Sequence, residues 1–399
     1  MNNKSVLISG AGIAGPTLAY WLKAAGFEPT LVEHAPAPRT GGYVIDFWGL
    51  GYDIAERMGL GEKINRVGYH MREMRIVDGA GARIAGFGTG VFSELTGGRY
   101  VTLGRSDLSR LLLEKAGGVE TRFGNEIASL REDADGVQVT FKHAQERHYD
   151  LLIGADGLHS NVRRLAFGPQ EQYEHTLGYV VAAFEVNGYR PRDEQIYLLY
   201  GRPGYMVGRF ALHSDRTLFL LVFADADGRR SRAHDLPAQK RVLHEVYGDG
   251  QWECAQILAA LDRAPDLYFD RVSQIRMPNW SRGRIALVGD AAFCVSLMAG
   301  QGSALAMTAA YVLAGELARA EGRYEEAFAC YEALLRDFIA GKQKGAERFA
   351  GALAPKTDWG LFVRNQVARL FNIPGLARLS FGRDIADMLE LPRYRWPAL

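Results

Sequence analysis

The sequence of 399 residues predicts an α/β protein, with a mainly parallel sheet, an antiparallel β-sheet domain and a C-terminal helical segment. Three observations predict this fold class. Near the N-terminus an apolar strand runs directly into a glycine-rich turn. Two further apolar strands, far along the chain, each end at an aspartate. Between these two strands lies a series of segments in which apolar and polar residues alternate. The length also favours more than one domain.

Composition excludes several classes of partner. The chain is 48% hydrophobic and 23% charged and has a formal net charge of +1, so no general field would attract nucleic acid or anionic lipid. We expect neither a nucleic-acid nor a membrane partner. The uncharged stretches 5–22 and 291–315 are interrupted by glycines and are interpreted as buried α/β segments. Three widely spaced cysteines fit no disulfide framework and no metal-binding spacing. These features favour a cytoplasmic protein with no metal site.

The first fifty residues predict a strand, a turn, a helix and a second strand. In "SVLISGAGIAGPTLAYWL" the apolar run at residues 6–8 is followed by the GxGxxG spacing of Gly10, Gly12 and Gly15, with Ala14 inside the turn. Such glycines permit a tight turn, a close approach of a diphosphate and close packing of helix on strand. The second strand ends at Glu33, where a carboxylate accepts hydrogen bonds from an adenosine ribose and repels a 2′-phosphate. This segment predicts a Rossmann-like site for FAD or NAD and does not distinguish between them.

Two downstream motifs favour FAD. "LLIGADGLHS" predicts a strand, then a turn with Asp156, then a helix capped by Ser160, and "IALVGDAAF" predicts a strand that ends at Asp290. A simple NAD dehydrogenase needs neither motif, whereas the longer FAD needs a second anchor. A carboxylate in apolar surroundings, such as that of Asp290, is costly unless a ligand or a protein group compensates it.

At these motifs the whole chain resembles the FAD-dependent aromatic hydroxylases, or class A flavoprotein monooxygenases, of the para-hydroxybenzoate hydroxylase fold. The resemblance implies a GR2-type FAD-binding domain. It also implies that the AMP half of FAD lies on the glycine turn and Glu33, that Arg105 contacts the cofactor, and that Asp156 serves both FAD and NAD(P)H. Asp290 would bind the ribityl–phosphate region. Gly300, Gln301 and Gly302 would open a helix whose N-terminus faces the flavin.

In finer detail, "RTGGYVIDFWG" is most similar to the tetracycline-inactivating branch of this family. That similarity implies Asp46 near the flavin and Arg39 near the nicotinamide cofactor. We expect aromatic side chains to line the substrate pocket; the residues considered are Tyr43, Phe47, Trp48, Tyr205, Phe210, Phe223 and Phe293. Taken singly, an aromatic side chain of this kind favours a place in the core over a ligand contact.

The sequence departs from the family pattern in the last motif. The family usually has histidine where Phe293 stands, proline where Leu297 stands and asparagine where Ala304 stands. Flavin contacts there are largely made by the backbone, so we expect FAD binding to survive. The departures put the handling of substrate near Phe293 in doubt.

We predict a discontinuous FAD-binding domain at residues 1–70, 101–175 and 275–350. The substrate-binding β-sheet domain is predicted at 71–100 and 176–274, where "MREMRIVDGAGARIAGF" predicts a hairpin that turns at Asp78 and Gly79. The strands "YVVAAFEV", "QIYLLY", "YMVGRFAL" and "TLFLLVFA" would complete an antiparallel sheet over the flavin. C-terminal helices are predicted at 351–399.

The resemblance implies a monooxygenase that uses NAD(P)H and O₂ to hydroxylate an aromatic or polycyclic small molecule through a flavin C4a-hydroperoxide. A polyketide or a tetracycline-like antibiotic would be such a substrate, and we expect a monomer or homodimer. Alternatives remain. An FAD-dependent reductase of the same superfamily would act on a prenyl group without O₂, and a flavin-binding module would have no activity. A flavin-dependent halogenase would be expected to carry WxWxIP, which the sequence lacks.

Overall fold

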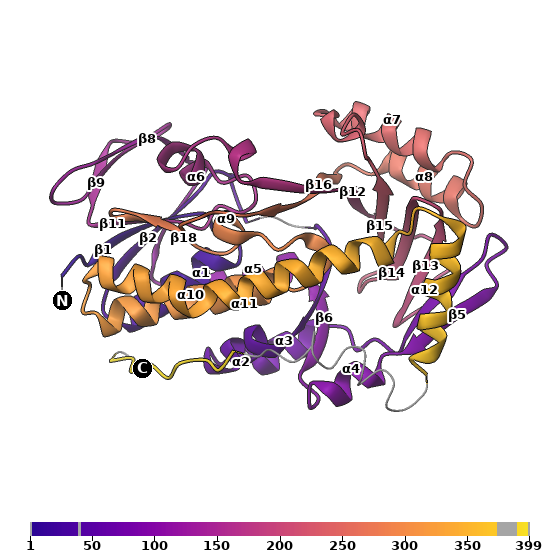
Figure 1. Cartoon of the computed structure of the whole chain (residues 1–399), viewed down its shortest axis with the longest axis horizontal. Coiled ribbons are helices and arrows are strands. Elements are labelled where there is room, and N and C mark those ends of the chain that lie inside the picture. Colours follow the sequence, from indigo (N-terminus) through magenta and orange to yellow (C-terminus); the bar gives the residue numbers. More distant parts are fainter. Residues whose placement is uncertain (1, 39–40, 373–388, 398–399) are drawn as a thin grey trace.

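Two large sheets lie side by side along the molecule, and the long helix α11 (Tyr324–Leu353) runs along both (Figure 1). The computed structural model describes residues 2–38, 41–372 and 389–397. Each sheet takes strands from distant parts of the chain, so neither forms from one continuous segment.

The six-stranded sheet has the parallel order expected of a nucleotide-binding domain. Its strands, in spatial order, are β17 (Ser281–Arg282), β18 (Ile285–Leu287), β11 (Leu151–Gly154), β1 (Ser5–Ser9), β2 (Glu28–Glu33) and β7 (Glu120–Phe123). All neighbours are parallel except β17 and β18. The residues Val6–Ile8 of β1 and Leu151–Ile153 of β11 are apolar and fully buried because both faces of the sheet are covered.

Helices and two smaller sheets surround this core. The helices that pack on one another beside the sheet are α1 (Ala14–Ala24), α2 (Gly49–Arg57), α5 (Arg105–Lys115) and α10 (Gly302–Arg319). The smaller sheets contain β3 (Val44–Trp48) with β6 (Tyr100–Gly104), and β8 (Ile127–Glu132), β9 (Val137–Phe141) and β10 (Arg147–Tyr149). Shorter helical segments are α3 (Gly61–Val67), α4 (Gly90–Leu95), α6 (Asn161–Ala166), α9 (Asp290–Phe293), η1 (Gln170–Gln172), η2 (Arg230–Arg232) and η3 (Leu297–Ala299).

The seven-stranded sheet contains the predicted alternating strands. Its spatial order is β16 (Tyr268–Ile275), β12 (Glu174–Asn187), β15 (Arg216–Ala224), β14 (Tyr205–Ala211), β13 (Ile196–Arg202), β4 (Glu73–Val77) and β5 (Arg83–Gly88). The β4–β5 hairpin turns at Asp78 as predicted, because its carboxylate accepts hydrogen bonds from the N–H groups of Ala80 and Ala82. One detail differs from the prediction. The β13–β4 pair is parallel, since these strands come from distant segments and no tight turn fixes their direction.

Helices cover one face of the seven-stranded sheet, and the C-terminal segment packs elsewhere. α7 (Leu236–Tyr247) and α8 (Cys254–Arg263) bury one shared core with this face. α12 (Asp358–Leu370) packs on β5 and β13. The described residues after it, 371–372 and 389–397, contain no helix, so the predicted C-terminal helices reduce to the end of α11 and α12 within the described chain. Tyr394 and Trp396 of this last segment pack against Tyr311 of α10.

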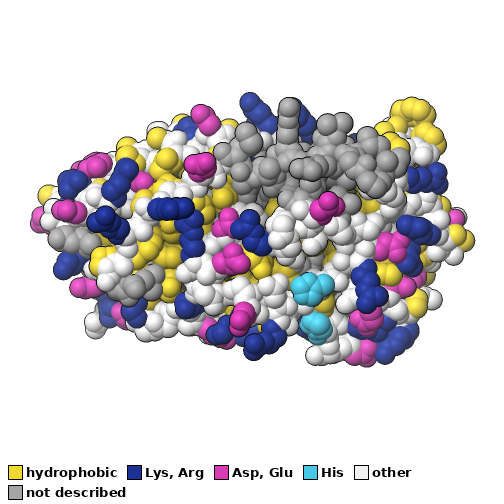
Figure 2. Space-filling view, turned by 90° about the horizontal axis from the view of Figure 1, so that it is seen from below, with side chains coloured by type: hydrophobic (Ala, Val, Ile, Leu, Met, Phe, Trp, Pro, Cys, Tyr) yellow, Lys and Arg dark blue, Asp and Glu magenta, His cyan; other side chains and the backbone are white. Residues whose placement is uncertain are grey.

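The surface mixes charges of both signs. Figure 2 shows Lys and Arg side chains interspersed with Asp and Glu side chains over the face seen from below. In the ranges that the structure describes, every helix is either too short or too polar to cross a bilayer. The domain boundaries stay a prediction. The strand order of the two large sheets shows which strands each domain would contain.

Candidate functional site

Four of the predicted motifs meet at one edge of the six-stranded sheet. Strands β1, β2, β11 and β18 are parallel neighbours, so their carboxyl ends lie along the same edge. Glu33 ends β2, and the glycine turn from Gly10, Asp156 and Asp290 come just after the ends of the other three strands. Ligands of open α/β sheets bind outside the carboxyl ends of the strands. This edge is therefore the candidate site.

The glycine turn leaves its backbone open at one position only. A Cβ on Gly10 would lie 2.4 Å from the carbonyl oxygen of Ala155, and one on Gly15 would lie 1.9 Å from that of Gly10. A Cβ on Gly12, in contrast, would meet no atom closer than the Arg105 guanidinium at 3.9 Å. Helix α1 follows with no side-chain cap on its first N–H groups. Open backbone, an uncapped helix N-terminus and an arginine suit a diphosphate.

Glu33 closes the turn from the neighbouring strand. Its Oε2 accepts a hydrogen bond from the N–H of Ala11 at 2.8 Å, and its Oε1 accepts one from the N–H of Ala35 at 3.0 Å. The carboxylate thus lies beside the glycine turn, where the fingerprint predicts the ribose. Contact with a ribose stays a prediction.

The Asp290 carboxylate has a charge partner that is distant in sequence. Burial raises the pKa of Asp290, while the positive charge of Arg105 and a hydrogen bond from the Cys294 thiol oppose this rise. Arg105 begins α5, and its guanidinium lies 6.0 Å from the ring centroid of Tyr43. The Tyr43 ring lies 5.4 Å from that of Tyr268. The carboxylate, the guanidinium and the two phenol rings therefore form one half-buried cluster.

Asp156 is held by the turn that contains it. Its Oδ2 accepts hydrogen bonds from the Val162 N–H at 3.0 Å and from the Ser9 hydroxyl at 3.4 Å, and Ser160 donates to its Oδ1. Ser160 also caps α6, as predicted. Burial raises the pKa of Asp156, and these donors oppose the rise.

The "GQG" segment places a helix N-terminus beside Asp290. α10 begins at Gly302, and a Cβ on Gly302 would lie 3.7 Å from Oδ1 of Asp290. No side chain caps its first turn, and Gln301 occupies the N-cap position. A Cβ on Gly300 would lie 4.0 Å from the Trp48 ring. A flavin edge beside this end would meet N–H groups and the positive end of the helix dipole.

Sequence reasoning missed Arg163, which joins the two aspartate turns. This side chain is fully buried. Its guanidinium donates to the carbonyl of Leu158 at 2.6 Å and to that of Ala291 at 2.9 Å. The signal available in the sequence was an arginine between the apolar Val162 and Leu165 of a short helix. Arg163 thus links the turn after Asp156 to the short helix that begins at Asp290.

The seven aromatic residues considered for the substrate pocket do not gather in one place. Tyr43 packs against the cluster that contains Phe210, and Trp48 lies near Gly300. Phe47 is fully buried in the core beneath β3. Phe293 is also buried, with its ring 4.7 Å from that of Trp280.

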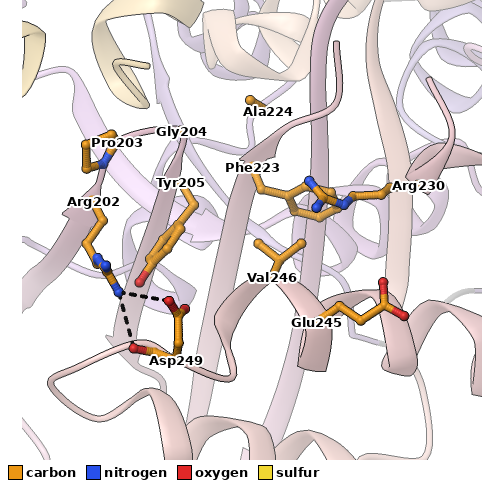
Figure 3. Close-up of a pocket in the computed structure, with 10 residues that line it drawn as sticks. All are labelled: Arg202, Pro203, Gly204, Tyr205, Phe223, Ala224, Arg230, Glu245, Val246 and Asp249. Carbon is orange, nitrogen blue, oxygen red and sulfur yellow. Dashed lines mark hydrogen bonds and ion pairs between the residues drawn. The ribbon is translucent and has the colours of Figure 1, made fainter. Parts of the chain in front are cut away.

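Tyr205 and Phe223 require a correction. Both lie on the face of the seven-stranded sheet that packs against α7 and α8, whereas Phe210 lies on the opposite face. Figure 3 shows Tyr205 and Phe223 among the residues that line an outer hollow of about 480 Å³, opposite Val246 of α7. Residues that alternate along a strand face opposite sides, so these two side chains do not share a pocket with Phe210 and Tyr43.

The structure shows what surrounds two of the residues that depart from the family pattern, Leu297 and Ala304. Leu297 packs with Val222 and Leu353, where the loop after Asp290 meets the seven-stranded sheet. Ala304 lies so close to Gly51 of α2 that a Cβ on Gly51 would come within 2.6 Å of the Ala304 methyl group. A side chain at position 51 would therefore force these helices apart. Arg39, expected near the nicotinamide cofactor, lies outside the described residues.

These residues fit FAD. The open backbone at Gly12 and the uncapped start of α1 suit its diphosphate, and the half-buried Asp290 suits its ribityl hydroxyls. The uncapped start of α10 suits the pyrimidine edge of its flavin. Within residues 2–38, 41–372 and 389–397, no cluster of three His, Cys, Asp or Glu side chains could hold a metal ion.

Comparison with known proteins agrees with this site. A family model described as FAD binding domain matches residues 3–334. A flavin-dependent monooxygenase of Legionella longbeachae is 34% identical over 399 residues, which covers 98% of this chain and 98% of the relative. An uncharacterized protein of Mycobacterium tuberculosis is 40% identical over 346 residues, or 85% of this chain and 92% of the relative.

Solved structures extend the likeness to the whole fold. The crystal structure of tetracycline destructase Tet(55) has a TM-score of 0.85 at 31% identity and covers 99% of this chain and 100% of that chain. Klebsiella pneumoniae HpxO, crystallised with FAD and uric acid, has a TM-score of 0.79 at 26% identity over 96% of this chain and 97% of that chain. The predicted fold class, the family resemblance and the FAD cofactor are confirmed. The chain belongs to the FAD-binding-domain family and is an FAD-dependent monooxygenase, an oxidoreductase of the aromatic-hydroxylase type.

Proposed function

We propose that this monooxygenase uses NAD(P)H and O₂ to hydroxylate a polycyclic aromatic molecule, such as a polyketide or a tetracycline-like antibiotic. The observation that carries the proposal is the aromatic cluster beside the cofactor edge. There Tyr43 and Tyr268 of the Arg105–Asp290 cluster pack against Phe210, Tyr69 and Tyr197 from other elements. The tetracycline destructase similarity supports a fused-ring substrate.

Bound FAD would accept a hydride from NAD(P)H and activate O₂ for transfer of one oxygen atom to the substrate. The chain's own residues then have three tasks. Gly12, Arg105 and the start of α1 would bind the diphosphate, and Asp290 would orient the ribityl chain. The N-terminus of α10 would stabilise negative charge on the reduced ring. The aromatic walls would exclude water from the reacting centre.

The proposal is tested by NADH and NADPH oxidation assays with a panel of fused-ring phenols and tetracyclines, in air and without O₂. We expect substrate-stimulated oxidation in air and products that carry one atom of ¹⁸O from ¹⁸O₂. Turnover of a prenyl substrate that continues without O₂ would instead favour the superfamily reductase. FAD binding without activity on any compound would favour the third alternative, a flavin-binding module without catalytic activity.

A further inference from the structure

The last described residues of the chain, 389–397, form a segment that packs on helices of the cofactor-binding half of the molecule (Figure 1). We call it the C-terminal strap. Its side chains alternate between two sides: Tyr394 and Trp396 are half-buried, whereas Arg393 and Arg395 are exposed. Such alternation is typical of an extended chain with one side packed against the protein. The strap therefore presents its aromatic side chains to the helices and its charges to solvent.

Helix α10 has a notch that the strap fills. Gly315 lies inside this helix, and a Cβ there would come within 2.1 Å of the Tyr394 ring. The Tyr394 hydroxyl donates to the carboxylate of Glu316 at 2.7 Å, beside the ion pair of Glu316 with Arg319. Glu316 is only 1% exposed. A glycine inside a helix costs stability, and a buried carboxylate needs donors. The packing of Tyr394 gives both features of α10 a purpose.

The strap also joins α10 to α1 and α2. The Trp396 ring lies 4.6 Å from the ring of Trp21 on α1 and 5.6 Å from that of Tyr311 on α10. The Tyr311 hydroxyl donates to the carbonyl of Pro392 at 2.9 Å and accepts a hydrogen bond from Arg57, at the end of α2, at 2.8 Å. Both Trp21 and Tyr311 are fully buried. The strap thus contacts α1 and α10 together.

The same two helices begin at the cofactor edge. α1 starts at Ala14, after the glycine turn, and α10 starts at Gly302, beside Asp290. FAD, with its diphosphate at the start of α1 and its flavin at the start of α10, would hold the two helices at these ends. Gly315 lies about 20 Å farther along α10, at about 1.5 Å per residue. FAD and the strap therefore act on one helix pair at different places along it.

We propose that the C-terminal strap and FAD stabilise each other's binding, so that cofactor occupancy determines whether the strap is docked. α1 and α10 pack directly on each other, so fixing them at one place leaves less freedom to be lost at the other. The coupling is reciprocal: the factor by which the docked strap tightens FAD binding is the factor by which FAD favours docking. Tyr394 and Trp396 are positioning residues, since they act on the cofactor only through the helices. A released C-terminal segment is open to proteases, so chains without FAD are cleaved first.

Two helix glycines provide a matched pair of variants. Gly315→Ala places a methyl group where the Tyr394 ring lies and so displaces the strap. Gly341→Ala is the control, because Gly341 lies inside α11 and a Cβ there would meet no atom within 4 Å. Both changes raise helix propensity equally. Tyr394→Ala is a further variant that empties the notch and leaves α10 unchanged, so it keeps the test valid if Gly315→Ala does not fold.

The experiment has two readouts, neither of which is activity. Flavin titration of apoprotein measures the dissociation constant of FAD. Mass spectrometry measures how fast carboxypeptidase Y releases Trp396, with and without saturating FAD. Wild type should release Trp396 at least fivefold more slowly with FAD than without. Gly315→Ala and Tyr394→Ala should each bind FAD at least fivefold more weakly and release Trp396 quickly even with FAD. Gly341→Ala should match wild type in both readouts.

Three outcomes would overturn the inference. The first is equal release of Trp396 from wild-type apoprotein and holoenzyme. The second is an unchanged FAD dissociation constant in Tyr394→Ala. The third is a loss of FAD affinity in Gly341→Ala as large as that in Gly315→Ala, which would show a general effect of helix substitution. These measurements need neither NAD(P)H nor substrate, so their result does not depend on the proposed function.

Discussion

The two acidic sites of this protein, Asp290 and Asp46, are built in different ways. Asp290 lies just after the last parallel strand, and the start of α10 and the thiol of Cys294 beside it come from the same short stretch of chain, while only Arg105 comes from a distant helix. Asp46 depends on hydroxyl groups from two strands, β6 and β13, and β13 lies in the other large sheet.

The difference follows from how each site gets its geometry. At the edge of a parallel sheet, strand ends and helix starts position backbone groups, and glycines keep that backbone accessible. On the face of a sheet, register between distant strands decides which side chains meet. The first kind of geometry follows from the order of elements along the chain, and the second follows from the pairing of distant strands.

The largest expected effect distinguishes two glycines of the cofactor edge. In Gly15→Ala the new methyl group would collide with the backbone carbonyl of Gly10, so we expect the free energy of unfolding to fall by about 3 kcal/mol or more. In Gly12→Ala the methyl group has space in the protein and occupies the room for the diphosphate. We expect apoprotein stability to stay within about 0.5 kcal/mol of wild type while FAD binding is lost. Denaturant unfolding of apoprotein and flavin titration measure the two effects. Equal FAD affinity in Gly12→Ala and wild type would contradict the assignment of Gly12 to the diphosphate site.

The next effect concerns the carboxylate of the cofactor edge. Asp290→Asn keeps the shape and loses the charged acceptor, so FAD affinity should fall at least tenfold, or about 1.4 kcal/mol. Burial raises the pKa of Asp290, so ionisation disfavours the folded apoprotein. Wild-type apoprotein should therefore lose stability relative to Asp290→Asn as pH rises from the ordinary aspartate value through the raised pKa. Arg105 makes this loss smaller, because its charge partly compensates the carboxylate. Thermal melts across this pH range check the sign, and a wild-type apoprotein that gains stability with pH would show that Arg105 dominates.

A matched pair tests the two faces of the seven-stranded sheet. Phe210→Leu and Phe223→Leu each shorten a buried aromatic side chain, so each should cost about 1–1.5 kcal/mol of stability. Only Phe210 lies on the face toward Tyr43, so only Phe210→Leu should raise KM, by a few-fold. Steady-state kinetics beside denaturant unfolding separate the two effects. An unchanged KM in Phe210→Leu would remove this residue from the substrate pocket.

The smallest expected effect concerns a link between the two regions. His159, in the turn after Asp156, lies 2.9 Å from Asp270 of β16, and this carboxylate raises the pKa of His159. The stabilisation is fully present below the ordinary histidine value of about 6.5 and is lost as pH rises through the raised pKa. His159→Asn should therefore lower the Tm more at pH 5.5 than at pH 9. The pair is partly exposed, so the free-energy difference should be about 0.2–1 kcal/mol. A pH-independent difference would show that the pair does not contribute through charge.

Local motifs made the cofactor edge predictable. A strand, a glycine turn and a helix start follow one another along the chain, so the positions of Gly10, Asp156 and Asp290 at one edge follow from strand direction alone. The charge partner of Asp290 was not predictable in this way, because Arg105 reaches it from a helix much earlier in the chain.

Side-chain partners across the seven-stranded sheet could not be predicted, because the alternation of residues within one strand does not determine its register with a distant strand. The pairing of β13 with β4, which brings Tyr197 near the two-stranded sheet, is an example. One error was avoidable. Tyr205 and Phe210 are an odd number of positions apart on β14, so alternation alone would have put them on opposite faces.

The parallel sheet is interrupted in sequence, and this interruption sets the order of assembly during synthesis. β1 begins at residue 5, but β18 of the same sheet is synthesised much later. Asp290 emerges only after every strand of the seven-stranded sheet has been synthesised. At about 5–20 residues per second, the ribosome needs roughly 15–60 s to reach that point. During this interval the nascent chain has no complete FAD site, so FAD binding does not yet stabilise it. A shortage of riboflavin should therefore reduce the survival of finished chains, while the yield of the folded seven-stranded sheet on the ribosome stays the same.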